Sequence, residues 1–170
     1  MTALLAFSQF VDALTRFVGY HVRWLILAAV VVSAVNAIIR KAFDSSSNAW
    51  LELQWLLFGA VFMLAAASVL QQNAHVRIDA LSQYFSRRTR DWIDLLGHIF
   101  FLLPLCVLMV WLGVPYFWEA FRNGELSQNA GGLIVWPSKF LILAGFALLL
   151  AQGVSEVIKR WAVIRGLRHD

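Results

Sequence analysis

The sequence predicts an all-α integral membrane protein with four transmembrane helices. Three observations lead to this fold class. First, 61% of the 170 residues are hydrophobic and 14% are charged, whereas soluble domains have about 25% charged residues. Second, the mean hydropathy is +0.70. Third, four apolar runs are each long enough to cross the hydrocarbon core, which takes about 20 helical residues. A chain of this length cannot bury so much apolar surface by itself, so a bilayer must cover it.

The four runs define a single membrane domain over residues 1–170. Charged residues gather in the gaps between the runs, and tryptophans stand near their ends. Indole rings favour the boundary between water and hydrocarbon, so these tryptophans mark the span ends. We expect the spans roughly at residues 21–43, 50–71, 87–121 and 137–160.

The distribution of Lys and Arg predicts that both chain ends lie in the cytoplasm. The segment before the first span has two basic residues, the middle loop has four and the C-terminal segment has four, whereas the two alternate loops together have four. Basic segments are retained on the cytoplasmic side, so the topology is expected to be N-in, C-in. This basic side suits anionic lipid headgroups rather than nucleic acid.

Two short segments, residues 1–20 and 74–86, are expected to be amphipathic interfacial helices on the cytoplasmic side. In the first, apolar residues recur at helical spacing, while Gln9, Asp12 and Arg16 fall on the opposite side. A helix with this pattern lies in the membrane surface with its large apolar side chains in the headgroup boundary. The apolar residues of the first segment are Phe7, Phe10, Val11, Leu14, Phe17 and Val18.

The third span is long, since an unbroken helix over residues 87–121 measures about 50 Å. Pro104 and Pro115 each remove a backbone donor and crowd the preceding turn. We therefore expect a bend at each proline. Ser86 stands just before the run and is expected to cap the helix by accepting a bond from a free backbone N–H.

The ionisable residues argue against a self-sufficient carrier. Carriers usually place such a group deep in a span, and none lies near the middle of a predicted span here. A stand-alone small carrier therefore remains only as an alternative. An enzyme is not expected, because the serines have no His and Asp in catalytic order, and Gly131 and Gly132 are not followed by the GK[ST] of a phosphate loop.

His21 and His98 give a second alternative, a haem b membrane anchor of a redox complex. Both stand near the cytoplasmic ends of their predicted helices, and two facing imidazoles can hold a haem inside a helix bundle. An interfacial or structural role is favoured, because the other histidines, His75 and His169, belong to surface segments and give no second pair.

Glu52 and Asp94 are acids near the starts of their spans. The partly positive N-terminus of a helix stabilises an anion in its first turn, and this is the favoured interpretation for both. An ion pair between subunits is the second interpretation, and a transport site is the third.

Four strings of the sequence resemble one family. They are residues 48–58 (NAWLELQWLLF), 73–79 (NAHVRID), 92–97 (WIDLLG) and 131–139 (GGLIVWPSK). In this order, spacing and four-helix setting, they are similar to the small membrane subunit of tripartite ATP-independent periplasmic (TRAP) transporters, the DctQ-type family. The resemblance covers nearly the whole chain, from the first span to the last.

The resemblance implies one part of a three-part secondary uptake system in the bacterial inner membrane. In that family a periplasmic solute-binding protein captures the solute, most often an organic acid. A large membrane permease subunit carries the solute with a sodium gradient, and the substrate and sodium sites belong to it. The small subunit implied for this chain is a fixed support that holds no cofactor, and we expect it to enlarge and anchor the frame of the large subunit.

Two groups of residues are candidates for contacts. The first group would make structural contacts or contacts with the large subunit, and its cytoplasmic members at residues 75–79 are expected to staple the second span to the surface helix. The second group lies on the side of the binding protein and forms a candidate docking edge, with a solvated loop as the equal alternative. The first group is Trp50, Glu52, Trp55, His75, Arg77, Asp79, Trp92 and Asp94, and the second is Glu125, Gly131, Gly132 and Lys139.

Overall fold

The computed structural model describes residues 2–44, 47–72 and 86–165. In these residues the chain is helical, without a named strand, and the four predicted spans are confirmed as helices long and apolar enough to cross a membrane. An isolated bridge joins Leu126 to Ile134 in the connection before the fourth span. The elements are α1 (Thr2–Phe43), α2 (Asn48–Gln71), α4 (Arg87–Gly97), the π-helical turn η1 (His98–Leu102), α5 (Leu103–Asn123) and α6 (Trp136–Ile164).

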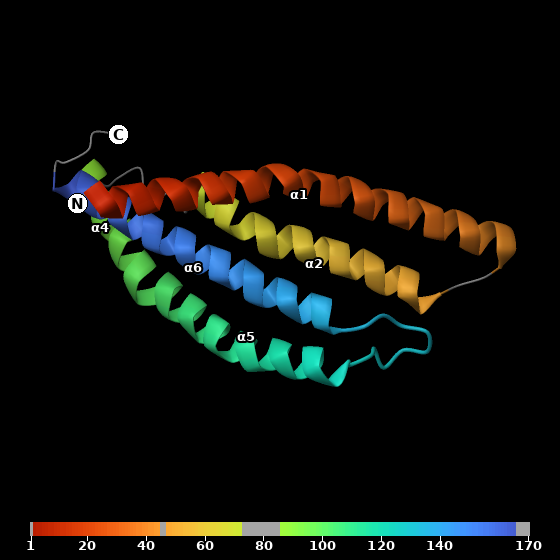
Figure 1. Ribbon diagram of the computed structural model, residues 1–170. Helices are drawn as coiled ribbons and strands as arrows, with labels where there is room; N and C mark the ends of the chain where they lie inside the picture. The colour runs from red at the N-terminus through yellow and green to blue at the C-terminus, as the bar shows by residue number, and fades with distance from the viewer. Residues whose placement is uncertain (1, 45–46, 73–85, 166–170) are drawn as a thin grey trace.

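The helices lie side by side in the order α1, α2, α6, α5 (Figure 1). α6 packs against all three of the others, and α1 also packs against α2, whereas α5 packs against α6. The helices therefore form a layer with α6 in its interior. We call the end where α1 begins and α6 ends the terminal end, and the end with the α1–α2 and α5–α6 connections the far end. α1 and α2 extend further than α5 and α6 at the far end (Figure 1).

α1 joins the predicted surface segment 1–20 and the predicted span 21–43 in one continuous helix. Its 42 residues measure about 63 Å, about twice the thickness of the hydrocarbon core. No proline interrupts it. Gly19 lies where α1 closely approaches α2, since a Cβ there would be 2.5 Å from Ser68 Oγ. Whether the first turns lie on the membrane surface stays a prediction. The other predicted surface segment, 74–86, lies outside the described residues except for Ser86.

In the first half of α1, two hydroxyl residues face the protein, whereas most of the apolar side and the predicted polar residues Gln9 and Arg16 are exposed. Ser8 and Thr15 are buried, whereas Phe10 and Phe17 are 67% and 63% exposed. Val11 is the exception among the predicted apolar residues, since it is buried inside the protein. A helix that faces lipid has this distribution, because hydrocarbon solvates the apolar side chains and the protein satisfies the polar ones.

The third span changes its helical geometry ahead of a proline. η1 immediately precedes α5, and Pro104 occupies the start of α5. Because Pro104 has no N–H, it cannot complete the regular ladder, and a wider turn accommodates the ring. Figure 1 shows the resulting curve from α4 into α5. Pro115 lies inside α5 without ending the helix, and the cap at Ser86 is confirmed by a 3.2 Å bond that its Oγ accepts from Thr89 N–H.

Small residues bring the helices close together. Cys106, Gly113 and Ala120 recur every seven residues on the buried side of α5, and a Cβ on Gly113 would lie 3.3 Å from Leu143 of α6. A Cβ on Gly145 of α6 would lie 2.8 Å from Met63 Cβ of α2. Close helix contacts through small residues are typical of membrane proteins, where dispersion drives packing.

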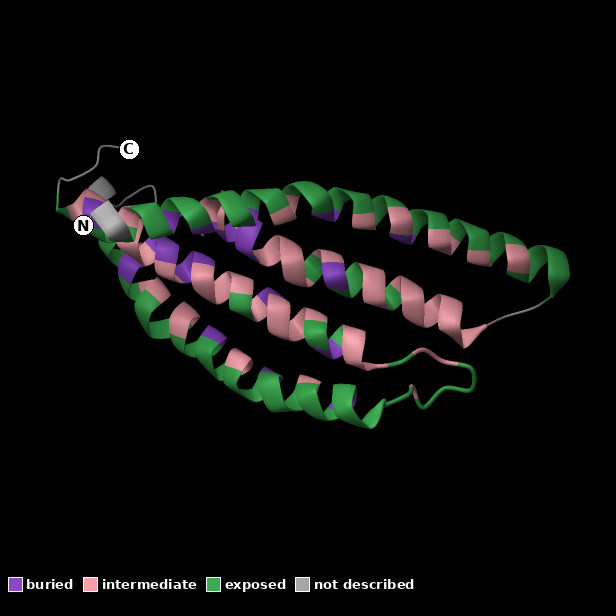
Figure 2. Cartoon of the chain, in the orientation of Figure 1, coloured by how far each residue is buried: buried purple, intermediate pink, exposed green. Residues whose placement is uncertain are grey.

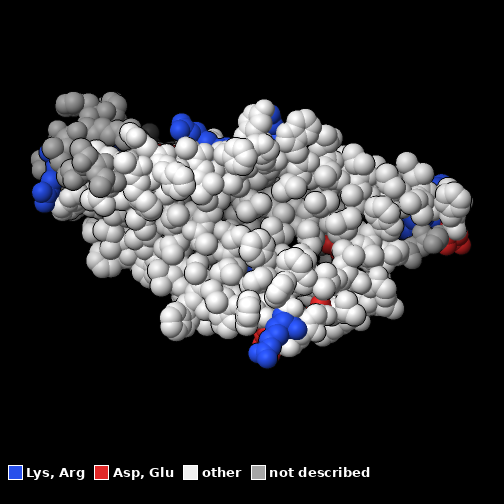
Figure 3. Space-filling view, in the orientation of Figure 1, with Lys and Arg blue, Asp and Glu red and all other residues white. Residues whose placement is uncertain are grey.

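Burial is concentrated near the terminal end. Figure 2 shows buried residues gathered where α1, α2 and α6 meet at that end, and exposed residues along the outer sides of α1 and α5. Most of the face seen in Figure 3 has no Lys, Arg, Asp or Glu. The polar contacts between elements described below lie at the two ends of the layer.

Candidate functional site: polar contacts at the two ends

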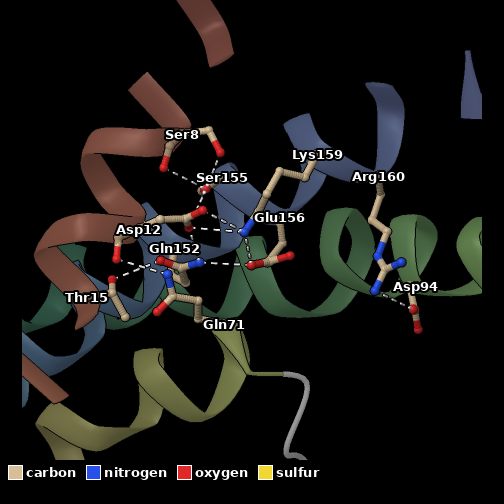
Figure 4. A network of polar contacts seen from close by, with 10 residues as sticks. All are labelled: Ser8, Asp12, Thr15, Gln71, Asp94, Gln152, Ser155, Glu156, Lys159 and Arg160. Atoms are coloured by element: carbon tan, nitrogen blue, oxygen red, sulfur yellow. Dashed lines mark hydrogen bonds and ion pairs between the residues drawn. The ribbon is translucent and has the colours of Figure 1, made fainter. Parts of the chain in front are cut away.

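Eight polar residues at the terminal end form a network between three helices (Figure 4). α6 contributes four of them at helical spacing, so that all four lie on the side of α6 that faces α1. We call this network the terminal cluster. Its members are Ser8, Asp12 and Thr15 of α1, Gln71 of α2, and Gln152, Ser155, Glu156 and Lys159 of α6.

Lys159 is the only cation of the terminal cluster and bonds to both of its carboxylates. Its Nζ lies 3.1 Å from each carboxylate oxygen of Asp12 and 2.6 Å from Glu156 Oε1. At most 20% of each of the three side chains is exposed. Removing charges from water is costly, so each of these groups depends on its partners here. The ion pair between Asp12 and Lys159 fixes α1 to α6.

Gln152 is fully buried and uses both ends of its amide. Its Nε2 donates to Asp12 Oδ1 and to Glu156 Oε1, both at 2.9 Å, and its Oε1 accepts a 2.9 Å bond from Thr15 Oγ1. This single side chain therefore orients both carboxylates and an α1 hydroxyl. Hydrogen bonds to charged groups are stronger than neutral ones, and burial raises the cost of losing them.

Further bonds complete the terminal cluster, among them one of 3.2 Å from Ser155 Oγ to Asp12 Oδ1. The hydroxyls of Ser8 and Ser155 lie 2.7 Å apart across the α1–α6 contact. Gln71 Nε2 donates to the backbone oxygen of Asp12 at 2.9 Å, which fixes the last turn of α2 to α1. Three helices are therefore held together at one end by one connected network.

Arg160 extends these contacts to α4. Its guanidinium donates to Asp91 Oδ1 at 2.9 Å and lies 3.5 Å from Asp94 Oδ2. The candidate residue Asp94 of α4 therefore faces α6, where Arg160 is one of its partners. Arg160 can bridge two carboxylates because its guanidinium presents donors on several edges.

At the far end, Glu52 fastens the connection between α5 and α6 to α2. Its carboxylate accepts bonds from Ser127 Oγ, from Asn129 Nδ2 at 2.8 Å and from Leu133 N–H at 2.6 Å. A Cβ on Gly132 would come within 2.7 Å of Glu52 Oε1, so only glycine fits beside the carboxylate. These bonds organise the connection around one anion.

The candidate docking residues Glu125 and Lys139 are paired with each other. Lys139 Nζ lies 2.5 Å from Glu125 Oε2 and 4.0 Å from the centroid of the Tyr116 ring. The Lys139 side chain is 10% exposed and the Glu125 side chain 45%. Glu125 is therefore the more accessible member of the pair. Gly131 adopts a left-handed conformation, φ +71°, which glycine tolerates without strain.

The remaining candidate residues have varied positions. Trp55 is 65% exposed and Trp92 is 39% exposed, while Trp50 is half-buried in the first turn of α2. His75, Arg77 and Asp79 lie outside the described residues, so the predicted staple is not described.

Sequence reasoning missed most of the terminal cluster. The signal was present in the last span, where polar residues recur at positions 152, 155, 156 and 159, the spacing of one helix face. Ser8 and Thr15 carried no comparable signal, because isolated hydroxyl residues occur on any helix face. Lys159 entered the prediction only through the count of basic residues.

A cavity of about 480 Å³ lies between α2, α6 and the connection that Glu52 holds. Its walls are mostly apolar and include Trp55, Gly59 and Met63, and Glu52 and Asn129 stand at its edge. The Glu52 carboxylate is already bonded to three donors. An organic acid anion would meet an apolar wall and a negative charge here, so the cavity does not suit that class of solute.

The two histidines considered for haem lie on different parts of the layer. His21 of α1 bonds through Nδ1 to the backbone oxygen of Phe17 at 2.8 Å. His98 belongs to η1, which packs against α6, α4 and α5. Within the described residues, no group of three or more His, Cys, Asp and Glu side chains is placed to hold a metal ion.

Comparison with known proteins adds an independent finding. The family described as "Tripartite ATP-independent periplasmic transporters, DctQ component" matches residues 29–163, which is most of the chain. Comparison with curated proteins and with solved structures gave no significant match. The matched region contains α2, α4, η1 and α5, all of α6 except its last residue, and the last third of α1. The chain therefore belongs to the DctQ family, the small component of the TRAP transporters.

Proposed function

We propose that this chain is the immobile support of a TRAP transporter in the bacterial inner membrane, with both ends of the chain in the cytoplasm. Its partners are the large permease subunit, which carries the solute with a sodium gradient, and a periplasmic solute-binding protein. The solute class is organic acids. The observation that carries the proposal is that ion pairs join α6 to α1 and α4 at the terminal end, while the bonds of Glu52 and the Lys139–Glu125 pair fasten the α5–α6 connection to α2 and α6 at the far end.

A moving carrier domain needs a frame that does not move with it. In this chain the terminal cluster ties α1, α2 and α6 together, and Arg160 adds α4. Glu52 ties the far end of α2 to the connection that leads into α6. Packed cores and satisfied polar networks resist deformation. A layer fixed at both ends is suited to hold the large subunit in place.

The alternatives have less support. A stand-alone carrier needs an ionisable group available to bind its solute or ion, but the carboxylates of Asp12, Glu52 and Glu156 all bond to other groups of the chain. A haem anchor needs two imidazoles that converge, and His21 and His98 belong to elements that pack on α6 rather than on one another.

Reconstitution tests the proposal. Liposomes would contain this chain alone, the large subunit alone, or both, with the binding protein and a labelled organic acid outside. We expect uptake only when all three components and an inward sodium gradient are present. The purified chain should bind no solute in a calorimetric titration and show no haem absorption. Sodium-driven uptake by this chain alone, or full uptake in its absence, would contradict the proposal.

A further inference from the structure

The exposed side of the first half of α1 has an unbalanced charge. Between Leu4 and Trp24, the charged residues that are exposed are Arg16 and Arg23, both positive. The one acid in this segment, Asp12, points toward Lys159 of α6 and pairs with it in the terminal cluster. Within the described part of the chain, no carboxylate forms an ion pair with Arg16 or Arg23. The exposed charged residues in this part of α1 are therefore all positive.

The two arginines share a helix face with two aromatic residues. Arg16, Tyr20, Arg23 and Trp24 follow the spacing i, i+4, i+7 and i+8, which places them in one stripe. We call these four residues the basic stripe. Tyr20 and Trp24 are 56% and 57% exposed. The rise from Arg16 to Arg23 is about 10 Å, so the stripe offers two separate positive charges with aromatic rings between and beside them.

The Arg23 side chain is held in a position to bind an anion. Its guanidinium carbon lies 3.5 Å from the centroid of the Tyr20 ring and 5.7 Å from that of Trp24. Stacking occupies the flat face of a guanidinium and leaves the N–H groups at its edge free to donate. Edge N–H pairs match the geometry of phosphate oxygens, to which they can donate two parallel bonds.

The position of the basic stripe along α1 indicates the source of the phosphate. The helix is mainly apolar from Trp24 to Ile39, about 24 Å, with Ser33 and Asn36 as its polar residues, and Arg40 and Lys41 follow at once. Basic residues therefore bracket the part of α1 that crosses the hydrocarbon, and long arginine side chains extend that part toward the full thickness of the core. Exposed tyrosine and tryptophan beside Arg23 are typical of the headgroup boundary.

We propose that the basic stripe of α1 binds the phosphate of an anionic phospholipid headgroup. Arg23, stacked on Tyr20, donates to the phosphate, and Arg16 supplies a second positive charge one to two turns further from the hydrocarbon. Charge complementarity favours this ligand, because two guanidinium groups at headgroup depth, neither in an ion pair with a described carboxylate, attract an anionic lipid over a zwitterionic one. This lipid site does not depend on the proposed transport function.

Native mass spectrometry of the delipidated full-length chain tests the site. The chain would be titrated with phosphatidylglycerol and, separately, with phosphatidylcholine. We expect the wild type to prefer phosphatidylglycerol, and the R16Q/R23Q variant to bind it about 30-fold more weakly, since each basic residue near a lipid surface contributes about a factor of five. The variant R40Q/K41Q is the matched control: it removes two positive charges from the same helix and should retain the wild-type affinity at the basic stripe.

Three results would overturn the proposal. One is equal affinity of the wild type for the two lipids. Another is unchanged phosphatidylglycerol binding by R16Q/R23Q. The third is that the R16Q/R23Q variant keeps its lipid but no longer co-purifies with the large subunit. That result would assign the basic stripe to a protein contact. Both arginines are exposed, so the variants should fold, and an unchanged helical circular dichroism spectrum would verify this.

Discussion

Lys159 has a larger structural role than its place near the end of α6 suggests. It is the only cation among the terminal cluster, where Asp12 and Glu156 would otherwise be two carboxylates with amide and hydroxyl partners alone. In an environment with little water, amide dipoles do not replace a full countercharge. The stability of the α1–α6 contact therefore depends strongly on one ammonium group.

The Lys159→Met substitution keeps the length and apolar stem of the side chain but removes its charge. It should lower the free energy of unfolding by about 3–5 kcal/mol, the usual cost of removing one partner from a buried ion pair. Thermal unfolding in detergent, followed by circular dichroism, measures the loss. The Arg165→Gln control removes a charge that is stacked on Trp161 at an exposed position, and should change stability little. Equal stability of Lys159→Met and the wild type would show that the terminal cluster does not hold the helices together.

Among the helices, the close approach of α2 and α6 depends on Gly145. A methyl group at this position would meet the backbone oxygen of Met63 at 2.9 Å as well as its Cβ. Because backbone atoms cannot rotate away as a side chain can, the two helices would have to separate. Gly59 of α2 differs, since nothing lies within 4 Å of the position its Cβ would occupy.

Comparing the Gly145→Ala and Gly59→Ala variants tests whether this difference in space governs stability. Gly145→Ala should destabilise the chain by about 1–3 kcal/mol through overpacking. Gly59→Ala should be neutral or stabilising by up to about 1 kcal/mol, because alanine is the better helix former. Unfolding temperatures of the two variants under identical conditions give the comparison. A similar loss in both would mean that the close α2–α6 approach at Gly145 has no special effect on stability.

The helical elements could be predicted from the sequence to a large extent, whereas their contacts could not. Long apolar runs and the serine at position 86 have direct physical signatures, and both predictions are confirmed. The division of α1 into two helices was not found, because a change from amphipathic to fully apolar pattern does not require a break in the backbone. Periodicity also cannot tell whether a polar helix side faces water or protein, and Ser8 and Thr15 face the protein.

For the whole molecule, fixation at both ends predicts that the α1–α6 contact does not change during transport. The hydroxyls of Ser8 and Ser155 are 2.7 Å apart, so cysteines at these positions can be joined by a disulfide with little movement of the backbone. The native Cys106 is buried and should not interfere. We expect S8C/S155C, reconstituted with its partners, to take up solute at the wild-type rate in both oxidised and reduced states.

The measurement is the initial uptake rate before and after addition of a reducing agent, with S8C alone as the control. Disulfide formation is verified by the difference in electrophoretic mobility between oxidised and reduced protein. An oxidised protein that stops transporting and recovers on reduction would show that α1 and α6 move relative to each other. In that case the chain would be part of the moving machinery instead of its support.

The interior position of α6 also affects how the molecule is made. Every other spanning helix packs against α6, and α6 follows all of them in the sequence. During synthesis, α1, α2 and α5 are therefore made before α6, the helix that joins α5 to the α1–α2 pair. Lys159 and Glu156 arrive with α6, so Asp12 lacks its countercharge until synthesis has passed position 159. The α1–α6 contacts of the terminal cluster can therefore form only after the first three spans have been made.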